Sequence, residues 1–320
     1  MTNFLTRHII NHYRDLVSEH VNLLTFEERK FAITKLRTFY LENFTAADAL
    51  LLIEEKLSIV KIVLKETGLG KTAALSVLLQ ELIEKKFLLP EEVDKKFAAP
   101  VSHVVAGLSR VRDLYQKNTS LETENFRKLF LTFAEDVRVI LITIAEQLYR
   151  MRTLDRYPED VQQKTARESS FLYAPLAHRM GLYAIKTELE DLSLKYTNRE
   201  IYKEIARKLN ETKRSRDKYI YEFITPLKEK LSELGYEFEI KGRTKSIHSI
   251  YNKIKKQNTS FENIYDLFAI RIIFDVPAEK EKAACWQAYS IVADMYQPNP
   301  NRLRDWLSIP KSNGYESLHT

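Results

Sequence analysis

Tyr236-Glu-Phe-Glu-Ile-Lys-Gly-Arg-Thr-Lys-Ser-Ile-His-Ser-Ile-Tyr-Asn-Lys253 is the stretch where the sequence changes from one class of structure to another. Apolar and charged residues alternate over 236–241, which is the period of a half-buried β-strand. The spacing then becomes helical, and Ser249 and Lys253, four positions apart, share one helical face. A strand followed by a cation-rich helix start is a candidate polyphosphate site, because helix N-termini and basic side chains both favour anions.

The residues before this stretch have the spacing of helices almost throughout. Only 7 glycines occur in 320 residues, and the apolar positions from residue 1 to about 150 recur at helical intervals. Segments 183–196 and 199–234 continue the pattern, so no strand is expected before residue 236. Downstream, the β-branched and aromatic residues of 264–274 predict a central strand, and 280–296 predicts a helix. The sequence therefore predicts an α+β protein with an all-α N-terminal part.

Composition limits the class of protein further. A chain of 320 residues with 44% hydrophobic and 29% charged residues is typical of a globular protein and is long enough for two domains. The single cysteine, Cys285, excludes a disulfide framework and fits a reducing cytosol. No apolar window is long enough to span a membrane, and the first residues lack the features of a secretory signal. We expect a cytoplasmic protein that does not contact membranes.

Positive charge is concentrated in one part of the chain. Residues 195–256 contain 17 Lys or Arg and 9 Asp or Glu, a local excess of +8, whereas the whole chain carries +6. This excess indicates either a solvated helix face, as 213–218 suggests, or a basic field that attracts polyphosphate or RNA. RNA binding is the least favoured interpretation, because we expect no interleaved exposed aromatic residues there and find no RNA-binding fold signature. Direct DNA binding is not expected.

Gly68-Leu-Gly-Lys-Thr72 resembles the end of a phosphate-binding P-loop. That loop needs a glycine five residues before Gly70, where this sequence has Lys65, and it needs a preceding strand, where this sequence has helical spacing. The segment is therefore predicted to be a turn between two helices.

Several ordered motifs resemble the synthetase domain of the RelA/SpoT homologue family. They are Tyr173-Ala-Pro-Leu-Ala-His-Arg-Met-Gly181, Lys186-Thr-Glu-Leu-Glu-Asp-Leu192, the cation-rich stretch 242–253, Asp266-Leu-Phe-Ala-Ile-Arg271, Arg304-Asp-Trp-Leu-Ser-Ile-Pro-Lys311 and Asn313-Gly-Tyr-Glu-Ser-Leu-His-Thr320. That domain transfers pyrophosphate from ATP to the 3′-hydroxyl of GTP or GDP and makes (p)ppGpp. The resemblance implies a nucleotidyltransferase-like α+β domain with a mixed sheet.

The resemblance also implies roles for individual residues. The residues implied for ATP are Arg243 and Arg271 on the adenine and Lys245, Ser249 and Lys253 on the phosphates. Asp266 is implied as a Mg²⁺ ligand, and Asp266, Arg243 and Lys245 as catalytic residues. Tyr315 is implied to stack on the guanine of GDP or GTP, with Lys311, Asn313 and His319 nearby. Asp266 and Arg271 are an odd number of positions apart, so either Asp266 precedes regular pairing or a bulge re-aims one of them.

The N-terminal half resembles the HD-type hydrolase half of the same family. The similarity lies in Val104-Val-Ala-Gly-Leu-Ser-Arg-Val111, Asp136-Val-Arg-Val-Ile-Leu-Ile142 and Met151-Arg-Thr-Leu-Asp-Arg-Tyr157. Active members carry histidine and aspartate metal ligands where this sequence has Glu55, Gln80, Glu81 and Glu146. A neutral amide is a poor ligand and glutamate is longer than aspartate, so we expect an inactive hydrolase retained as scaffold and regulator. The alternative is a new carboxylate site made by Glu55, Glu81 and Glu146.

The sequence thus predicts three segments: a degenerate hydrolase domain (1–158), a helical link (159–200) and a synthetase domain (201–320). The family's general base is a glutamate in a Glu-Val-Gln-Ile-Arg strand that would follow Thr320, so we expect a truncated fragment with weak or no turnover. Family members often carry C-terminal domains that contact the ribosome, and such contact is expected only through those domains. The alternative is a non-catalytic sensor of (p)ppGpp or another nucleotide.

Overall fold

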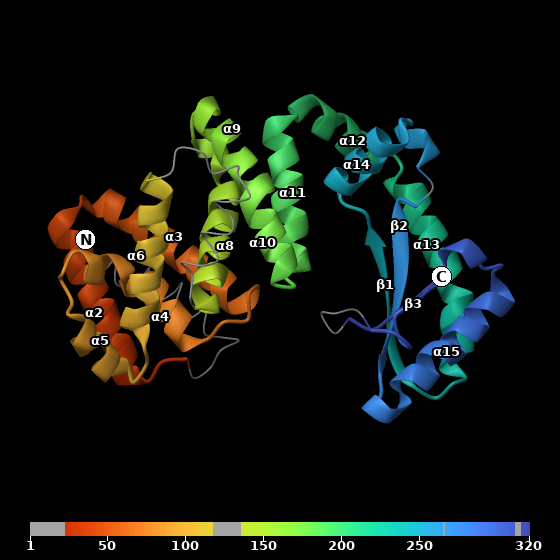
Figure 1. Cartoon of the computed structure of the whole chain (residues 1–320), viewed down its shortest axis with the longest axis horizontal. Coiled ribbons are helices and arrows are strands. Elements are labelled where there is room, and N and C mark those ends of the chain that lie inside the picture. Colours follow the sequence, from red (N-terminus) through yellow and green to blue (C-terminus); the bar gives the residue numbers. More distant parts are fainter. Residues whose placement is uncertain (1–22, 118–135, 265, 311–314) are drawn as a thin grey trace. The chain divides into compact units, whose positions relative to one another are not determined.

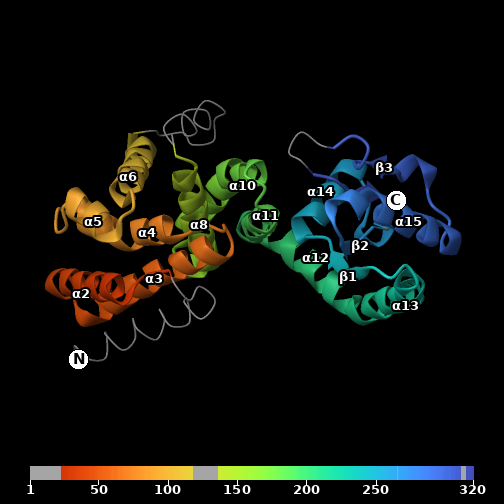
Figure 2. The ribbon, with the colours of Figure 1, turned by 90° about the horizontal axis from the view of Figure 1, so that it is seen from below.

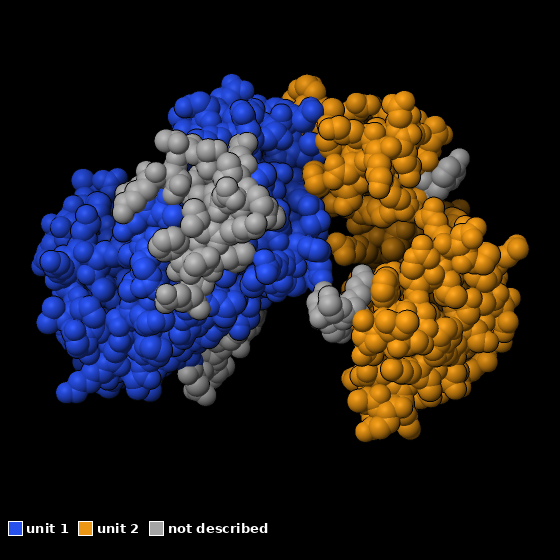
Figure 3. Space-filling view, in the orientation of Figure 1, with its two compact units in different colours: residues 1–199 blue, residues 200–320 orange. Residues whose placement is uncertain are grey.

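The computed structural model describes residues 23–117, 136–264, 266–310 and 315–320. The chain divides into two compact units, residues 1–199 and 200–320 (Figure 3). In the described residues the first unit is helical, whereas the second combines helices with short antiparallel sheets (Figure 1). The predicted α+β class is confirmed. None of the described helices is both long enough and apolar enough to cross a membrane.

The first unit is built from helices that begin and end at recognisable sequence signals. Thr25 and Glu28 form a capping box at the start of the first described helix, and Gly68, with φ of 72°, makes the turn between α3 and α4. The P-loop-like segment is therefore a helix–helix turn, as predicted. The helices are α2 (Phe26–Asn43), α3 (Ala46–Lys65), α4 (Lys71–Glu84), α5 (Pro90–Phe97), α6 (Val101–Lys117), α8 (Val137–Arg152), α9 (Glu159–Glu168), α10 (Ala174–Arg179) and α11 (Tyr183–Thr197), with the 3₁₀-helix η1 (Leu154–Arg156) and the π-helix η2 (Ser169–Tyr173).

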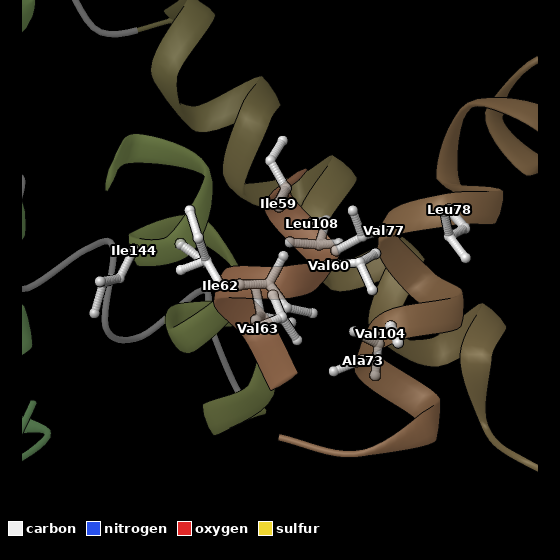
Figure 4. Close-up of a cluster of buried hydrophobic side chains, with 14 of the residues drawn as sticks. Ile59, Val60, Ile62, Val63, Ala73, Val77, Leu78, Val104, Leu108 and Ile144 are labelled. Atoms are coloured by element: carbon white, nitrogen blue, oxygen red, sulfur yellow. The ribbon is translucent and has the colours of Figure 1, made fainter. Parts of the chain in front are cut away.

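Four helices meet in the centre of this unit. Figure 4 shows Ile62 and Val63 of α3, Val77 of α4, Leu108 of α6 and Ile144 of α8 in one apolar cluster. The cluster extends into segment 159–197, whose helices bury apolar side chains in the same core. The core thus includes the predicted linking segment, and the boundary between the compact units falls at residues 199 and 200.

Gly107 lets α6 approach α8 closely. A β-carbon added at Gly107 would lie 2.6 Å from Cγ2 of Val139, a buried β-branched side chain that has little freedom to move. We therefore expect Gly107→Ala to lower the free energy of unfolding by about 1–3 kcal/mol, despite the better helix propensity of alanine. Thermal denaturation of the single variants and of Gly107→Ala with Val139→Ala would test the contact. If the contact causes the loss, Val139→Ala should relieve part of the cost of Gly107→Ala. A double variant whose loss of stability equals the sum of the two single losses would contradict the contact.

The second unit alternates helices and strands. The predicted helix over 199–234 is two helices, because the chain breaks at Thr212. The elements are α12 (Arg199–Glu211), α13 (Lys213–Ser232), β1 (Glu237–Thr244), α14 (Ile247–Gln257), β2 (Phe268–Asp275), α15 (Ala278–Met295), β3 (Arg304–Asp305) and β4 (Leu318–His319), with the 3₁₀-helices η3 (Phe261–Asn263) and η4 (Pro300–Arg302).

The β1–β2 pair is antiparallel and has two different faces. Phe238 and Ile240 of β1 and Ile272 and Phe274 of β2 lie on the face that packs against α13 and α15 (Figure 2). A β-carbon at Gly242 would lie 3.2 Å from Ile220 of α13, which confirms how closely the helix covers this face. The opposite face is exposed and carries the charged residues of both strands.

Two expectations for the sheet differ from the structure. In the described residues, β2 has β1 as its one hydrogen-bonded neighbour and so is not a central strand, and both sheets, β1–β2 and β3–β4, are two-stranded and antiparallel rather than mixed. The physical reason is that strand composition predicts that a segment is extended, whereas direction and neighbours depend on how the α14 connection returns the chain.

Candidate functional site

The end of β1 and the start of α14 are held in a fixed geometry. The amide of Lys245 donates to the carbonyl of Leu267 at 2.8 Å, which continues the pairing with the β2 side of the sheet. Ser246 is the N-cap of α14: its hydroxyl accepts from the amide of Ser249 at 3.2 Å and donates to the Ser249 hydroxyl at 2.9 Å. Lys245, Ser249 and Lys253 are thereby presented from one short strand–helix junction.

Asp266 joins this junction through two ion pairs. The ammonium groups of Lys245 and Lys253 both bind Oδ2 of Asp266, and each of the three side chains is about a third exposed, at 29%, 30% and 34% respectively. Asp266 lies two residues before β2, and the β1–β2 register is regular without a bulge. The first alternative, that Asp266 precedes regular pairing, is therefore correct.

The charges of this cluster shift one another's ionisation. Partial burial raises the pKa of Asp266, but the hydrogen bonds and charges of the two lysines outweigh burial and hold this pKa below its ordinary value. Burial and the neighbouring charge of Lys253 lower the pKa of Lys245, against the opposing effect of Asp266. At neutral pH Asp266 is thus a carboxylate within a cluster that carries an excess of positive charge.

Arg243 and Arg271 lie on the exposed face of the β1–β2 sheet. Arg243 is opposite Ala269, and Arg271 is two residues further along β2, so the two arginines share a face as diagonal neighbours. Such neighbours lie about 7–8 Å apart, within reach of one planar group between two guanidinium groups. The helices α13 and α15 cover the other face, which leaves this one accessible. The structure therefore brings together six of the residues predicted to bind ATP and metal: Arg243, Lys245, Ser249, Lys253, Asp266 and Arg271.

Tyr315 and His319 form a second group beside the β3–β4 sheet. The Tyr315 hydroxyl lies 2.9 Å from Nε2 of His319, and the two rings meet edge to face at 6.0 Å. Their segment is held to β3, because the amide of Trp306 donates to the carbonyl of Ser317 at 3.0 Å and Arg304 pairs with His319. Lys311 and Asn313, predicted to bind the same nucleotide, lie outside the described residues.

Two of the four substituted positions, Gln80 and Glu81, take part in hydrogen bonds with neighbouring side chains. The Tyr40 hydroxyl donates to Glu81 at 2.9 Å, and the Gln80 amide donates to Glu84 at 3.1 Å. Glu84 also accepts from Arg112 at 2.6 Å and from Ser109 at 2.7 Å. No group of three or more histidine, cysteine, aspartate or glutamate side chains in the described residues could hold a metal ion. Among the described residues, Glu55, Glu81 and Glu146 therefore do not form a group that could hold a metal ion.

Two glutamates of this half have pKa values shifted in opposite directions. Burial raises the pKa of Glu84, but hydrogen bonds from Ser109, Arg112 and Gln80 outweigh burial and lower it overall. Burial likewise raises the pKa of Glu146, and there the positive charges of Lys56 and Arg112 only partly offset it. An ionised Glu146 thus opposes folding at neutral pH, whereas an ionised Glu84 supports it.

We expect Glu146→Gln to raise the melting temperature of the first unit at neutral pH. The raised pKa of Glu146 means that protonation stabilises the fold; this contribution is fully present below the unfolded pKa of 4.5 and is lost as pH rises through the folded value. Glutamine imitates the protonated form, so its advantage should vanish on acidification. Below the unfolded pKa of 4.5, Glu146 is protonated in both the folded and the unfolded chain, so the variant and the parent should lose stability in parallel as Glu84 becomes protonated.

Melting curves from about pH 4 to about pH 8 measure this difference directly. Glu42→Gln, at an exposed position of α2, is the matched control and should give a nearly unchanged profile. A Glu146→Gln variant that melts below the parent at neutral pH would contradict the assignment.

Comparison with known proteins matches both units. Residues 37–183 match the HD domain, and residues 242–320 match the region found in RelA/SpoT proteins. Over these residues the chain belongs to the RelA/SpoT family. Six of the residues that the family resemblance predicted for ATP and metal fall in the second match and are brought together by the structure.

Relatives in this family have names for both directions of (p)ppGpp metabolism. A GTP pyrophosphokinase of Myxococcus xanthus is 38% identical over 263 residues, covering 81% of this chain and 34% of the relative. A probable guanosine-3′,5′-bis(diphosphate) 3′-pyrophosphohydrolase of Synechocystis is 35% identical, covering 80% and 33%. The bifunctional (p)ppGpp synthase/hydrolase SpoT of Escherichia coli is 33% identical, covering 81% and 36%. The chain spans about a third of the length of the curated relatives it matches.

Some features of this RelA/SpoT chain were missed by sequence reasoning. The contacts of Tyr40 with Glu81 and of Arg112 with Glu84 join residues far apart in the chain, and no local signal points to them. The serine cap at 246 could have been recognised, since serine before a helical run is a common N-cap.

The expectation that the basic segment lacks exposed aromatic residues was wrong. Tyr219 and Tyr221 of α13 are 57% and 71% exposed. Tyr219 packs edge to face against Phe268 of β2, with ring centroids 5.6 Å apart, and still leaves more than half of its side chain exposed. Acidic residues interrupt the basic ones, and Lys218 lies 3.7 Å from Glu222, so the surface is not a continuous cationic strip.

Proposed function

We propose that the second unit is a (p)ppGpp synthetase that binds ATP on the exposed face of the β1–β2 sheet and transfers pyrophosphate to the 3′-hydroxyl of GDP or GTP. The observation that carries this proposal is the convergence of Lys245, Lys253 and Asp266 beside a sheet face that presents Arg243 and Arg271. The match of residues 242–320 and the name of the Myxococcus relative support the same conclusion.

The proposed roles follow from the chemistry of each group. Guanidinium planes stack on aromatic bases, so Arg243 and Arg271 would hold the adenine. Ammonium groups and the capped start of α14 favour phosphate oxygens, which assigns Lys245, Ser249 and Lys253 to the ATP phosphates. The Tyr315 ring would stack on guanine, with Lys311, Asn313 and His319 beside that nucleotide.

Asp266 fits Mg²⁺ only together with phosphate oxygens. It is a hard oxygen donor at an accessible position, but the described residues offer no cluster of ligands that would hold a metal by itself. Mg²⁺ usually binds one or two carboxylates together with substrate phosphates, and such a shared site matches the single carboxylate here. When bound, Mg²⁺ would offset the negative charge that develops on the transferred group.

For the first unit we propose a scaffold and regulatory role without hydrolysis. Gln80 offers a neutral amide that donates to Glu84, and Glu81 accepts a hydrogen bond from the Tyr40 hydroxyl. Side chains engaged in this way are not arranged to bind a metal and activate water. Several relatives are named as hydrolases, and we propose that this chain differs from them in lacking hydrolysis.

Calorimetry with ATP, GDP and ppGpp, each with and without Mg²⁺, tests the nucleotide sites. We expect ATP and GDP to bind independently. Arg243→Ala should lower the affinity for ATP by about tenfold, which corresponds to about 1.4 kcal/mol, and should leave the affinity for GDP unchanged. Lys228→Ala, which removes an exposed positive charge from α13, is the matched control and should leave both affinities unchanged.

Binding of ppGpp alone, with an affinity that Arg243→Ala leaves unchanged, would replace the synthetase proposal by the nucleotide-sensor alternative. Thin-layer chromatography of labelled ATP incubated with GDP then measures transfer, and release of pyrophosphate from ppGpp measures hydrolysis. Hydrolysis that requires a divalent metal would overturn the proposal for the first unit.

A further inference from the structure

Two ammonium groups from different places in the chain share one carboxylate oxygen. Lys245 lies between β1 and α14, whereas Lys253 lies within α14, and both bind Oδ2 of Asp266. One negative charge therefore serves two positive charges that repel each other. The three side chains, which we call the Asp266 clamp, carry a net positive charge at neutral pH.

The clamp disfavours a divalent cation. A cation that approaches Asp266 must displace two ammonium groups from the oxygen it needs, and it meets their positive charge at short range. The described residues provide no second carboxylate cluster to compensate. A free metal ion should therefore bind Asp266 poorly as long as both lysines are engaged.

A polyphosphate reverses this balance. In the clamp the two ammonium groups share the single negative charge of Asp266, whereas a polyphosphate has several negatively charged oxygens. Each lysine can therefore leave Asp266 and bind phosphate oxygens of its own. Asp266 then lies beside negative phosphates without a counter-charge, which favours a divalent cation between them.

We propose that Lys245 and Lys253 lock Asp266 against divalent cations until a polyphosphate takes over both ammonium groups. This inference rests on the proposed nucleotide site. It implies that phosphate and metal bind to that site cooperatively and that each binds weakly without the other. Because linkage is reciprocal, the lock must also weaken metal-free polyphosphate binding, since Asp266 competes for the same lysines.

The metal side of the lock is tested with Mn²⁺ alone, followed by electron paramagnetic resonance. We expect Lys245→Met with Lys253→Met to bind Mn²⁺ about tenfold or more tightly than the parent chain. Lys255→Met with Lys256→Met removes the same charge from exposed positions of the same helix and should change the affinity by less than about twofold. Adding Asp266→Asn to the first pair should abolish the gain.

The phosphate side is tested with inorganic tripolyphosphate in the presence of a chelator. Asp266→Asn should bind it about tenfold or more tightly than the parent, because the two ammonium groups are released. Glu262→Gln removes a nearby carboxylate that pairs with Lys208 instead, and should change the affinity by less than about twofold.

Equal Mn²⁺ gains in the two lysine pairs would show a bulk charge effect and overturn the lock, as would unchanged tripolyphosphate binding in Asp266→Asn. Failure of the underlying site gives a different result: ATP would bind no better than tripolyphosphate and would ignore Arg243→Ala. Unchanged affinities for Mn²⁺ and tripolyphosphate in the clamp variants, together with ATP binding that depends on Arg243, would reject the lock but not the proposed nucleotide site.

Discussion

Replacing Lys245 and Lys253 together with methionine is expected to weaken ATP binding by about a hundred- to ten-thousand-fold in the presence of Mg²⁺. A hydrogen bond to a charged partner contributes about 1.5–3 kcal/mol, and two such contacts to the phosphates would be lost. Methionine keeps most of the apolar stem of lysine, so the packing of α14 should persist. Calorimetry with a non-hydrolysable ATP analogue measures the change without turnover.

The same variant pair changes two affinities in opposite directions, which makes this result hard to explain by misfolding. ATP should bind more weakly, Mn²⁺ alone should bind more tightly, and GDP should be unaffected. The pair Lys255→Met with Lys256→Met controls for charge on the same helix, at positions that are exposed. If the ATP affinity falls equally in the two double variants, the lysines act through the overall positive electrostatic potential and not through direct contacts with the phosphates.

Much of the fold was predictable because it depends on local spacing. The change of period at residue 236 located the start of β1 to within one residue, although β1 continues to Thr244, three residues beyond the predicted alternation. The predicted helix over 280–296 is α15 (Ala278–Met295). The break at Thr212 was missed, since neither glycine nor proline marks it. Strand direction and neighbours were also out of reach, because they follow from contacts between segments that sequence spacing does not encode.

The sequence predicted which residues belong to the candidate site, but it did not predict which of them contact one another. Motif resemblance selected Lys245, Lys253 and Asp266, but their shared oxygen joins residues 13 and 21 positions apart. Only the folded chain shows that a predicted metal ligand is bound by two predicted phosphate ligands. The same holds for Tyr40 and Glu81, which are 41 positions apart and meet through the helix packing of the first unit.

The other large effect is expected at Tyr315, for the guanine nucleotide. Tyr315→Ala should weaken GDP binding by about five- to 150-fold, because stacking of a base on an aromatic ring contributes about 1–3 kcal/mol. ATP binding should not change, since the residues proposed to bind ATP lie on the β1–β2 sheet and its junction with α14. Fluorescence titration with a labelled GDP analogue measures this loss, and calorimetry with the ATP analogue provides the comparison.

Tyr315→Phe separates the ring from its hydroxyl. The hydroxyl lies 2.9 Å from His319, so it orients the ring through a hydrogen bond that phenylalanine cannot make. If stacking dominates, phenylalanine should retain GDP affinity to within a few-fold, since loss of one such bond changes stability by about 0.5–1.5 kcal/mol. A Phe variant as weak as the Ala variant would assign recognition to the hydroxyl and His319. Unchanged affinity in both would remove Tyr315 from the guanine site, because a base stacked on this ring cannot be indifferent to its loss.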